Sequence, residues 1–240
     1  MFVGHYGVSL AAKRASSSLP LWLLFLAVQL LDVLFAIFVL LGIEKMNIVH
    51  GFTAFNPYDL YWMPYTHSLI GALAWSALTA GVCWVVTRRL PSRDRRIASL
   101  VLGAAVFSHF VLDVPVHTPD LPLWPGAASP RIGLGLWNHR LATTVAELAV
   151  LAAGGWVYLR QSRPRSRGAR LGTAAFGGVL VAAAIATPYQ PDPPSAQAFA
   201  VSALALYVVF AVLAGLVERG RQAALAAPGD RSPASASPLP

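Results

Sequence analysis

Charged residues are scarce in this sequence, and acidic residues are the scarcest of them. Only 12% of its 240 residues are charged, and only ten are aspartate or glutamate. A soluble domain usually has about a quarter charged residues, so the composition excludes an ordinary soluble globular domain. The hydrophobic fraction of 56% and the mean hydropathy of +0.59 indicate a membrane protein instead.

Cysteine and lysine are also scarce. The only cysteine, Cys83, lies inside an apolar run, and one cysteine cannot form an internal disulfide or a thiolate zinc cluster. The net charge of +8 comes from sixteen arginines and two lysines. In an apolar chain, such charges more often orient the protein in the bilayer than bind nucleic acid. We therefore expect the lipid bilayer as a partner and no nucleic acid.

Six long apolar segments are present, each close to the roughly 20 residues that cross a bilayer. They predict an all-α polytopic membrane helix bundle that forms one domain over residues 1–218. The remaining residues, 219–240, have too little apolar bulk to fold and predict a disordered tail. No internal repeat is evident, which disfavours a transporter built on inverted repeats. The expected spans are 20–43, 67–87, 97–114, 141–159, 171–187 and 197–217.

The arginines predict the orientation of the bundle. The connectors after the second and fourth spans each contain five arginines, whereas the opposite connectors contain only Lys45, Arg131 and Arg140. The positive-inside rule then places both termini in the cytoplasm and the loops 44–66 and 115–140 outside. We expect a multi-pass protein of the bacterial cytoplasmic (inner) membrane.

The first residues, MFVGHYGVSLAAKR, are too short to cross a bilayer and lack the features of a signal peptide. Two interpretations remain open. The segment can lie flat on the membrane, or it can enter the bundle as a half-helix covered by protein. Gly4 and Gly7 would permit the close helix contact that the second interpretation needs.

Several ionisable residues lie within the predicted spans, where each costs roughly 2.5 to 3.5 kcal/mol on insertion scales and needs a partner or a purpose. At about 1.5 Å per residue, two of them, Asp32 and His109, lie about 18 to 20 Å from the basic side. If the first segment enters the bundle, His5 would reach about 12 Å and approach the level of Asp32. These groups predict a site in the middle and outer part of the bundle. The groups within or beside the spans are Asp32, His67, His109, Asp113 and Glu147.

The stretch SHFVLDVPVHTPD contains the densest group. His109 and Asp113 are four residues apart and share one helix face, and imidazole with carboxylate suits zinc or manganese. A mutually satisfied structural pair is the alternative. Pro115 ends or kinks the helix, so His117 can turn away from that face. The candidate ligands of a divalent metal, with zinc favoured and manganese as the alternative, are His5, Asp32, His67, His109, Asp113 and His117.

Other polar and aromatic residues have simpler interpretations. Glu147 can be a ligand, a general base, or the partner of His139 or Arg140. His50 and Asp59 lie in an outer loop, where solvated side chains are expected. An interfacial aromatic belt explains the residues Tyr61, Trp62, Tyr65, Trp124 and Trp137.

Four short motifs resemble the predicted membrane-bound metal-dependent hydrolases of bacterial inner membranes. They are GHYGVSLAAKR at the start, QLLDVLF around Asp32, THSL at 66–69 and SHFVLD at 108–113. The resemblance covers roughly residues 1–125. It implies a hydrolase whose metal ligands correspond to His5, Asp32, His67, His109 and Asp113.

Three functions are compatible with these residues. A hydrolase would use the metal near the outer leaflet, with Asp113 or Glu147 as the catalytic carboxylate and a lipid or other membrane-borne ester as the substrate. A small permease or a proton or metal-ion transporter would use the same groups as a path. A scaffold protein would use them as buried polar contacts. The absence of charged residues from the last two spans favours a site over a path. The oligomeric state does not follow from the sequence.

Overall fold

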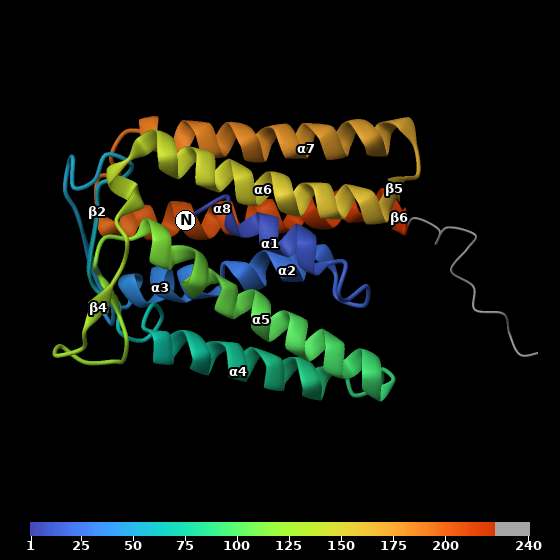
Figure 1. Ribbon diagram of the computed structural model, residues 1–240, viewed down its shortest axis with the longest axis horizontal. Helices are drawn as coiled ribbons and strands as arrows, with labels where there is room; N and C mark the ends of the chain where they lie inside the picture. Colours follow the sequence, from blue (N-terminus) through green and yellow to red (C-terminus); the bar gives the residue numbers. More distant parts are fainter. Residues whose placement is uncertain (224–240) are drawn as a thin grey trace, which may run out of the picture.

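The computed structural model describes residues 1–223 and forms a bundle of helices that run roughly along one direction (Figure 1). Within the described residues, five helices are long and apolar enough to cross a membrane, and a bent helix pair makes a sixth candidate span. The prediction of an all-α polytopic bundle is confirmed. The five long helices are α4 (Leu69–Val86), α5 (Ser92–Val116), α6 (Arg140–Gln161), α7 (Arg167–Ala186) and α8 (Ala196–Arg219).

The two ends of the bundle differ. One end carries the arginine-rich connectors before α5 and before α7, together with a small pairing of β5 (Ser162–Pro164) with β6 (Arg221–Ala223). We call it the basic end. The other end, which we call the cavity end, carries β2 and β4 and lies opposite in Figure 1.

Short hairpins and turns cover the cavity end. The cover packs tightly against the chain after α5 at Gly133. Glycine is required there, because its φ is +153° and a Cβ would lie 2.0 Å from the carbonyl oxygen of Thr118. The cover therefore rests directly on the end of α5. It consists of β1 (Lys45–Ile48) paired with β2 (Tyr58–Trp62), β3 (Leu121–Pro122) paired with β4 (Arg131–Ile132), and the short turns η1 (Leu136–Asn138) and η2 (Thr187–Tyr189).

The first predicted span is broken, which corrects the expectation of one continuous helix over 20–43. Helix α2 (Leu21–Val28) and helix α3 (Leu30–Leu40) meet at Gln29 at an angle of 57°. The break frees the Val28 carbonyl oxygen from the helical hydrogen-bond pattern, and His109 Nδ1 contacts that oxygen at 2.7 Å. A side chain from another helix thus replaces the lost backbone hydrogen bond, as a membrane interior requires.

Helix α1 (His5–Ala12) lies inside the bundle, so the half-helix interpretation of the first segment is the correct one. Val3, His5 and Tyr6 are fully buried, and α1 packs against α2, α5 and α6. The contact with α6 is very close, because a Cβ on Gly7 would lie 2.2 Å from the Val150 carbonyl oxygen. The absence of a side chain at Gly7 is what lets α1 reach this depth.

The chain after α8 also departs from the prediction. The tail was expected to begin at residue 219, but α8 continues to Arg219 and β6 pairs with β5 beyond it. Arg221 fixes this pairing, since its guanidinium donates to the Ser162 carbonyl oxygen at 2.7 Å and to Ser162 Oγ at 2.9 Å. The rest of the predicted tail, 224–240, lies outside the described residues.

Candidate metal centre

All six predicted ligands come together in one buried cluster near the cavity end. They are supplied by α1, α3, the segment before α4, and α5 with the residue that follows it. The four histidines direct Nε2 toward the carboxylates of Asp32 and Asp113. Asp113 Oδ2 lies 3.1 Å from the Nε2 atom of His109, 3.6 Å from that of His117 and 3.9 Å from that of His67. Pro115 lies within the last turn of α5, so His117 does not turn away from the face of Asp113.

The second carboxylate completes the arrangement. Asp32 Oδ1 lies 3.3 Å from His67 Nε2 and 3.4 Å from His109 Nε2. His5 Nε2 lies 3.5 Å from Asp113 Oδ1, and the His5 ring stacks on that of His109 at 4.1 Å. The four histidine side chains and Asp113 are 4% exposed or less, whereas the side chain of Asp32, which lines the cavity, is 21% exposed.

The spacings are those of ligands rather than of hydrogen-bonded pairs. Most exceed the N–H···O range of about 2.7 to 3.2 Å. Two ligand atoms on a tetrahedral ion with bonds of about 2.0 to 2.1 Å would lie about 3.3 to 3.4 Å apart. His109 Nε2 has the environment of a metal ligand. It is buried close to both carboxylates and has no hydrogen-bond partner among residues 1–223.

Two overlapping sets of side chains can hold a metal ion, since the ligand atoms of each set lie within 4.8 Å of one another. One set is His5, His109 and Asp113, and the other is Asp32, His67 and His109. Both sets need His109 Nε2, and one nitrogen can bind only one ion. The geometry therefore fits a single ion better than two ions that each have a complete set.

The outer nitrogens of the histidines are held by other groups, as is usual for metal-binding histidines. His109 Nδ1 contacts the Val28 carbonyl oxygen at 2.7 Å, and His117 Nδ1 contacts Asp120 Oδ1 at 2.9 Å. A carbonyl or carboxylate oxygen can only accept, so Nδ1 carries the proton in both rings and Nε2 of a neutral ring carries a lone pair. These lone pairs point at carboxylate oxygens, an arrangement that a cation would stabilise.

His67 is held through a chain of two residues that the sequence did not reveal. Thr66 Oγ1 donates to Glu44 Oε2 at 2.6 Å and can therefore accept from His67 Nδ1 at 2.8 Å. The backbone N–H groups of Tyr65 and Thr66 also donate to Glu44 Oε1. Burial raises the pKa of the Glu44 carboxyl, and these hydrogen bonds oppose that shift. The available signal was an isolated glutamate directly after the first span.

Tyr207 is a second partner that sequence analysis missed. Its hydroxyl donates to Asp32 Oδ2 at 3.0 Å, which leaves Oδ1 directed toward the histidines. Tyr207 is buried in α8, a helix without predicted site residues. The only indication in the sequence was the tyrosine itself, which lies in a predicted span without charged residues.

Glu147 has a different environment from the two aspartates. Its two oxygens each accept a backbone hydrogen bond at 2.7 Å, from Phe2 and from Gly4. It thereby fixes the segment that carries His5, while the Met1 nitrogen contacts Asp113. Within residues 1–223, Glu147 forms no ion pair with His139 or Arg140, and Arg140 Nε instead donates to the Ala54 carbonyl oxygen.

The outer-loop residues do not join the cluster, with one exception. His50 pairs with Asp192 at 2.7 Å, and Asp59 accepts from Asn47 at 2.9 Å. Trp137 is buried, and its ring centroid lies 4.1 Å from that of His117. Its assignment to an interfacial belt was therefore wrong, because it packs on a residue of the cluster.

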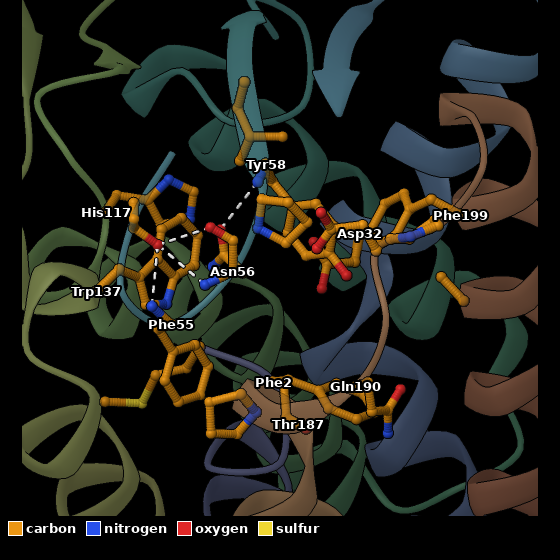
Figure 2. A pocket seen from close by; sticks show the side chains of 18 of the residues that line it. Phe2, Asp32, Phe55, Asn56, Tyr58, His117, Trp137, Thr187, Gln190 and Phe199 are labelled. Carbon is orange, nitrogen blue, oxygen red and sulfur yellow. Dashed lines mark hydrogen bonds between the residues drawn. The ribbon is translucent and has the colours of Figure 1, made fainter. Parts of the chain in front are cut away.

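A cavity of about 840 Å³ connects the cluster with the cavity end. Figure 2 shows His117 and Trp137 on one wall and Asp32 and Phe199 on the opposite wall. His67 and Asp113 also line it, so the cluster is accessible from the cavity. The apolar part of the wall is formed by Phe2, Phe35, Leu60, Met63, Phe199 and Leu206.

No protein-family model, curated protein or solved structure matches this chain.

Proposed function

We propose that the protein is a membrane-embedded metal-dependent hydrolase of the bacterial cytoplasmic membrane. In this proposal both termini are cytoplasmic, the cavity end faces outward, and the substrate is a lipid or another membrane-borne ester. One observation carries the proposal: four buried imidazoles direct Nε2 at two carboxylates beside a cavity of about 840 Å³. The sequence motifs that resemble the predicted membrane-bound hydrolases support the same conclusion.

The donor set favours zinc, with manganese as the alternative. Imidazole nitrogen and carboxylate oxygen suit both ions, whereas calcium and magnesium prefer oxygen ligands alone. His67, His109 and Asp32 would hold the ion, or His5, His109 and Asp113. A bound ion would polarise a phosphoryl or acyl oxygen and lower the pKa of water.

The chain's own residues would contribute orientation and proton transfer. Asp113 lines the cavity and contacts the histidines through both carboxylate oxygens. It can hold an imidazole in place or accept a proton from a water molecule beside the cluster. Tyr207 holds Asp32 through Oδ2. The apolar wall would keep the ester in a water-poor environment, where these polar groups act more strongly.

A transport path is less well supported. Between the cluster and the basic end, α1 and α2 bring together Tyr6, Leu21, Leu24 and Phe25, and all four are 0–1% exposed. A proton or ion path needs a series of polar groups across the membrane. The packing of these residues instead closes the bundle on the basic side of the cluster.

Metal analysis of the purified protein tests the proposal. The wild-type protein in neutral detergent should retain a stoichiometric divalent ion and hydrolyse a micellar fluorogenic acyl ester in a metal-dependent way. The double variant His109→Ala/Asp113→Ala should lose both, because few metal sites survive the loss of two ligands. His139→Ala/Asp59→Ala is the matched control, since it removes a histidine and an aspartate that lie outside the cluster and do not line the cavity. Full metal occupancy in the first double variant would overturn the metal assignment.

A further inference from the structure

The rim of the cavity carries a cation that the cluster does not use. Arg140 is the only arginine or lysine among the residues that line the cavity. Its Nε donates to the Ala54 carbonyl oxygen at 2.9 Å, and its guanidinium carbon lies 5.0 Å from the ring centroid of Tyr189. These two contacts hold the guanidinium between two loops of the cavity end. They use one of its five N–H groups.

No carboxylate of the cavity forms an ion pair with Arg140 in the described part of the chain. Asp192, at the same rim, is paired with His50 at 2.7 Å. The other acidic residues of the cavity, Asp32, Asp113 and Glu147, are engaged with the cluster or with the N-terminal segment. Among the described residues, Arg140 forms no ion pair within 4.0 Å and keeps its terminal N–H groups for a ligand.

Arg140 lies outward from the level of the cluster. Arg140 and Glu147 are seven residues apart in α6, which puts them on the same helix face about 10 Å apart along the axis. Glu147 binds the backbone on both sides of Val3, close to His5. A molecule that contacts Arg140 must therefore extend about 10 Å inward to reach this level.

Part of the wall beside the cluster and the rim is formed by apolar side chains of the candidate membrane spans. Phe35 and Phe199 line the cavity from α3 and α8. Leu206 also lines it and is 38% exposed on α8, a helix that is apolar enough to span the membrane. An alkyl chain would thus meet apolar side chains, whereas a small hydrophilic anion would gain nothing from them.

We propose that the cavity binds an anionic amphiphile, with the phosphate or carboxylate of its headgroup on Arg140 and its apolar part along α3 and α8. Guanidinium groups bind such oxyanions through paired, charge-assisted hydrogen bonds. For the hydrolysis, the inference rests on the proposed function. The bond that is cleaved then lies on the apolar side of the headgroup, beside the cluster. Arg140 is then the residue that selects the substrate by charge.

Binding of dodecyl phosphate to the purified protein in neutral detergent tests the inference. Arg140→Gln should weaken binding by about 10-fold or more, as expected for the loss of a hydrogen bond between charged groups. Arg140→Lys should give an intermediate affinity, because it keeps the charge but loses the paired geometry. Arg131→Gln is the matched control. Arg131 also donates to a loop carbonyl oxygen, that of Tyr61 at 3.0 Å, but does not line the cavity.

Two competitors distinguish binding of the whole amphiphile from binding of its anionic headgroup or its alkyl chain alone. Inorganic phosphate at the same concentration should not displace dodecyl phosphate, and dodecyltrimethylammonium should not displace it either. Displacement by inorganic phosphate would show a site for a free anion, and displacement by the cationic amphiphile would show apolar binding alone. Either result would overturn the inference, as would equal affinities of the wild type and Arg140→Gln.

The same measurement in the His109→Ala/Asp113→Ala background separates this inference from the proposed function. Binding that still depends on Arg140 in that background supports the anion site independently of any metal. If the wild type binds dodecyl phosphate through Arg140 but contains no metal and hydrolyses no ester, the proposed hydrolase fails and the amphiphile site stands. If Arg140 has no effect while the metal and the hydrolysis are present, the inference fails alone.

Discussion

The basic end and the cavity end hold their buried charges in different ways. At the basic end, Lys13 and Glu218 form one ion pair at 2.6 Å, and their side chains remain 16% and 24% exposed. At the cavity end, four histidines surround two aspartates, and His109 and Asp113 are only 0% and 2% exposed. The first arrangement pairs each charge with one opposite charge, adds backbone hydrogen bonds from nearby residues, and leaves some contact with solvent. The second collects several groups that could ionise and leaves His109 Nε2 without a hydrogen bond.

This difference indicates which charges stabilise the fold and which serve another purpose. Lys13 and Glu218 are satisfied by each other and by backbone groups at the end of the bundle. The cluster at the cavity end is costly in a membrane interior and is surrounded by residues that orient it, such as Tyr207 and Glu44. If the two ends are independent, a change in the ion pair should leave the metal affinity of the cluster unaltered.

The largest effect is expected at the contact between α1 and α6. A Cβ on Gly154 would lie 1.8 Å from the Gly7 carbonyl oxygen, whereas a Cβ on Gly155 would meet nothing within 4 Å. Gly154→Ala should push α1 away from α6 and move His5 out of the cluster. We expect a loss of about 1 to 3 kcal/mol in stability from overpacking, and a drop in metal affinity beyond the 10- to 100-fold typical of supporting residues.

Gly155→Ala provides the control, because it adds the same methyl group one residue further along α6. Thermal unfolding and metal titration of both variants measure the two effects. If the two variants behave alike, the close approach of α1 and α6 does not position the cluster.

A smaller effect is expected for His5 itself. His5→Ala should weaken metal binding by about 10- to 100-fold or more, because its Nε2 lies 3.5 Å from Asp113 Oδ1. The fold should change little, since the spanning helices are untouched. His50→Ala serves as the control for metal affinity, because the exposed His50 ring forms its hydrogen bond with Asp192, outside the cluster. Unchanged metal affinity in His5→Ala, together with a clear loss in His67→Ala, would leave His5 as a stacking partner of His109 only.

The sequence predicted the parts of this site that depend on local spacing. The i, i+4 relation places His109 and Asp113 on one face, and the structure has their side chains 3.1 Å apart. The apolar lengths likewise located the five long helices. The depth of Asp32 in its span matched that of His109 because a helix rises by a constant amount per residue.

Features that depend on contacts between distant segments did not follow from the sequence. The break at Gln29 has no proline or glycine to mark it, and it coincides with the contact between His109 and the Val28 carbonyl oxygen. Tyr207 and Asp32 are 175 residues apart in the chain, and no local pattern connects them. Trp137 looked like an interfacial residue because its burial depends on how the loops fold over His117.

The smallest effect is expected for the ion pair at the basic end. The double variant Lys13→Met/Glu218→Gln removes both charges of the ion pair, so neither is left buried without a partner. A glutamine at 218 keeps an oxygen that can accept from the Leu21 backbone N–H, as Glu218 does at 2.7 Å. Stability should therefore fall by about 1 kcal/mol or less, and metal affinity should stay at the wild-type value. Packed side chains of α1 and α2, such as Tyr6 and Phe25, whose rings stack at 4.5 Å, lie between this pair and the cluster. A tenfold or greater change in metal affinity, measured by titration of the metal-depleted double variant, would mean that the ion pair sets the depth of α1 and that the two ends act as one unit.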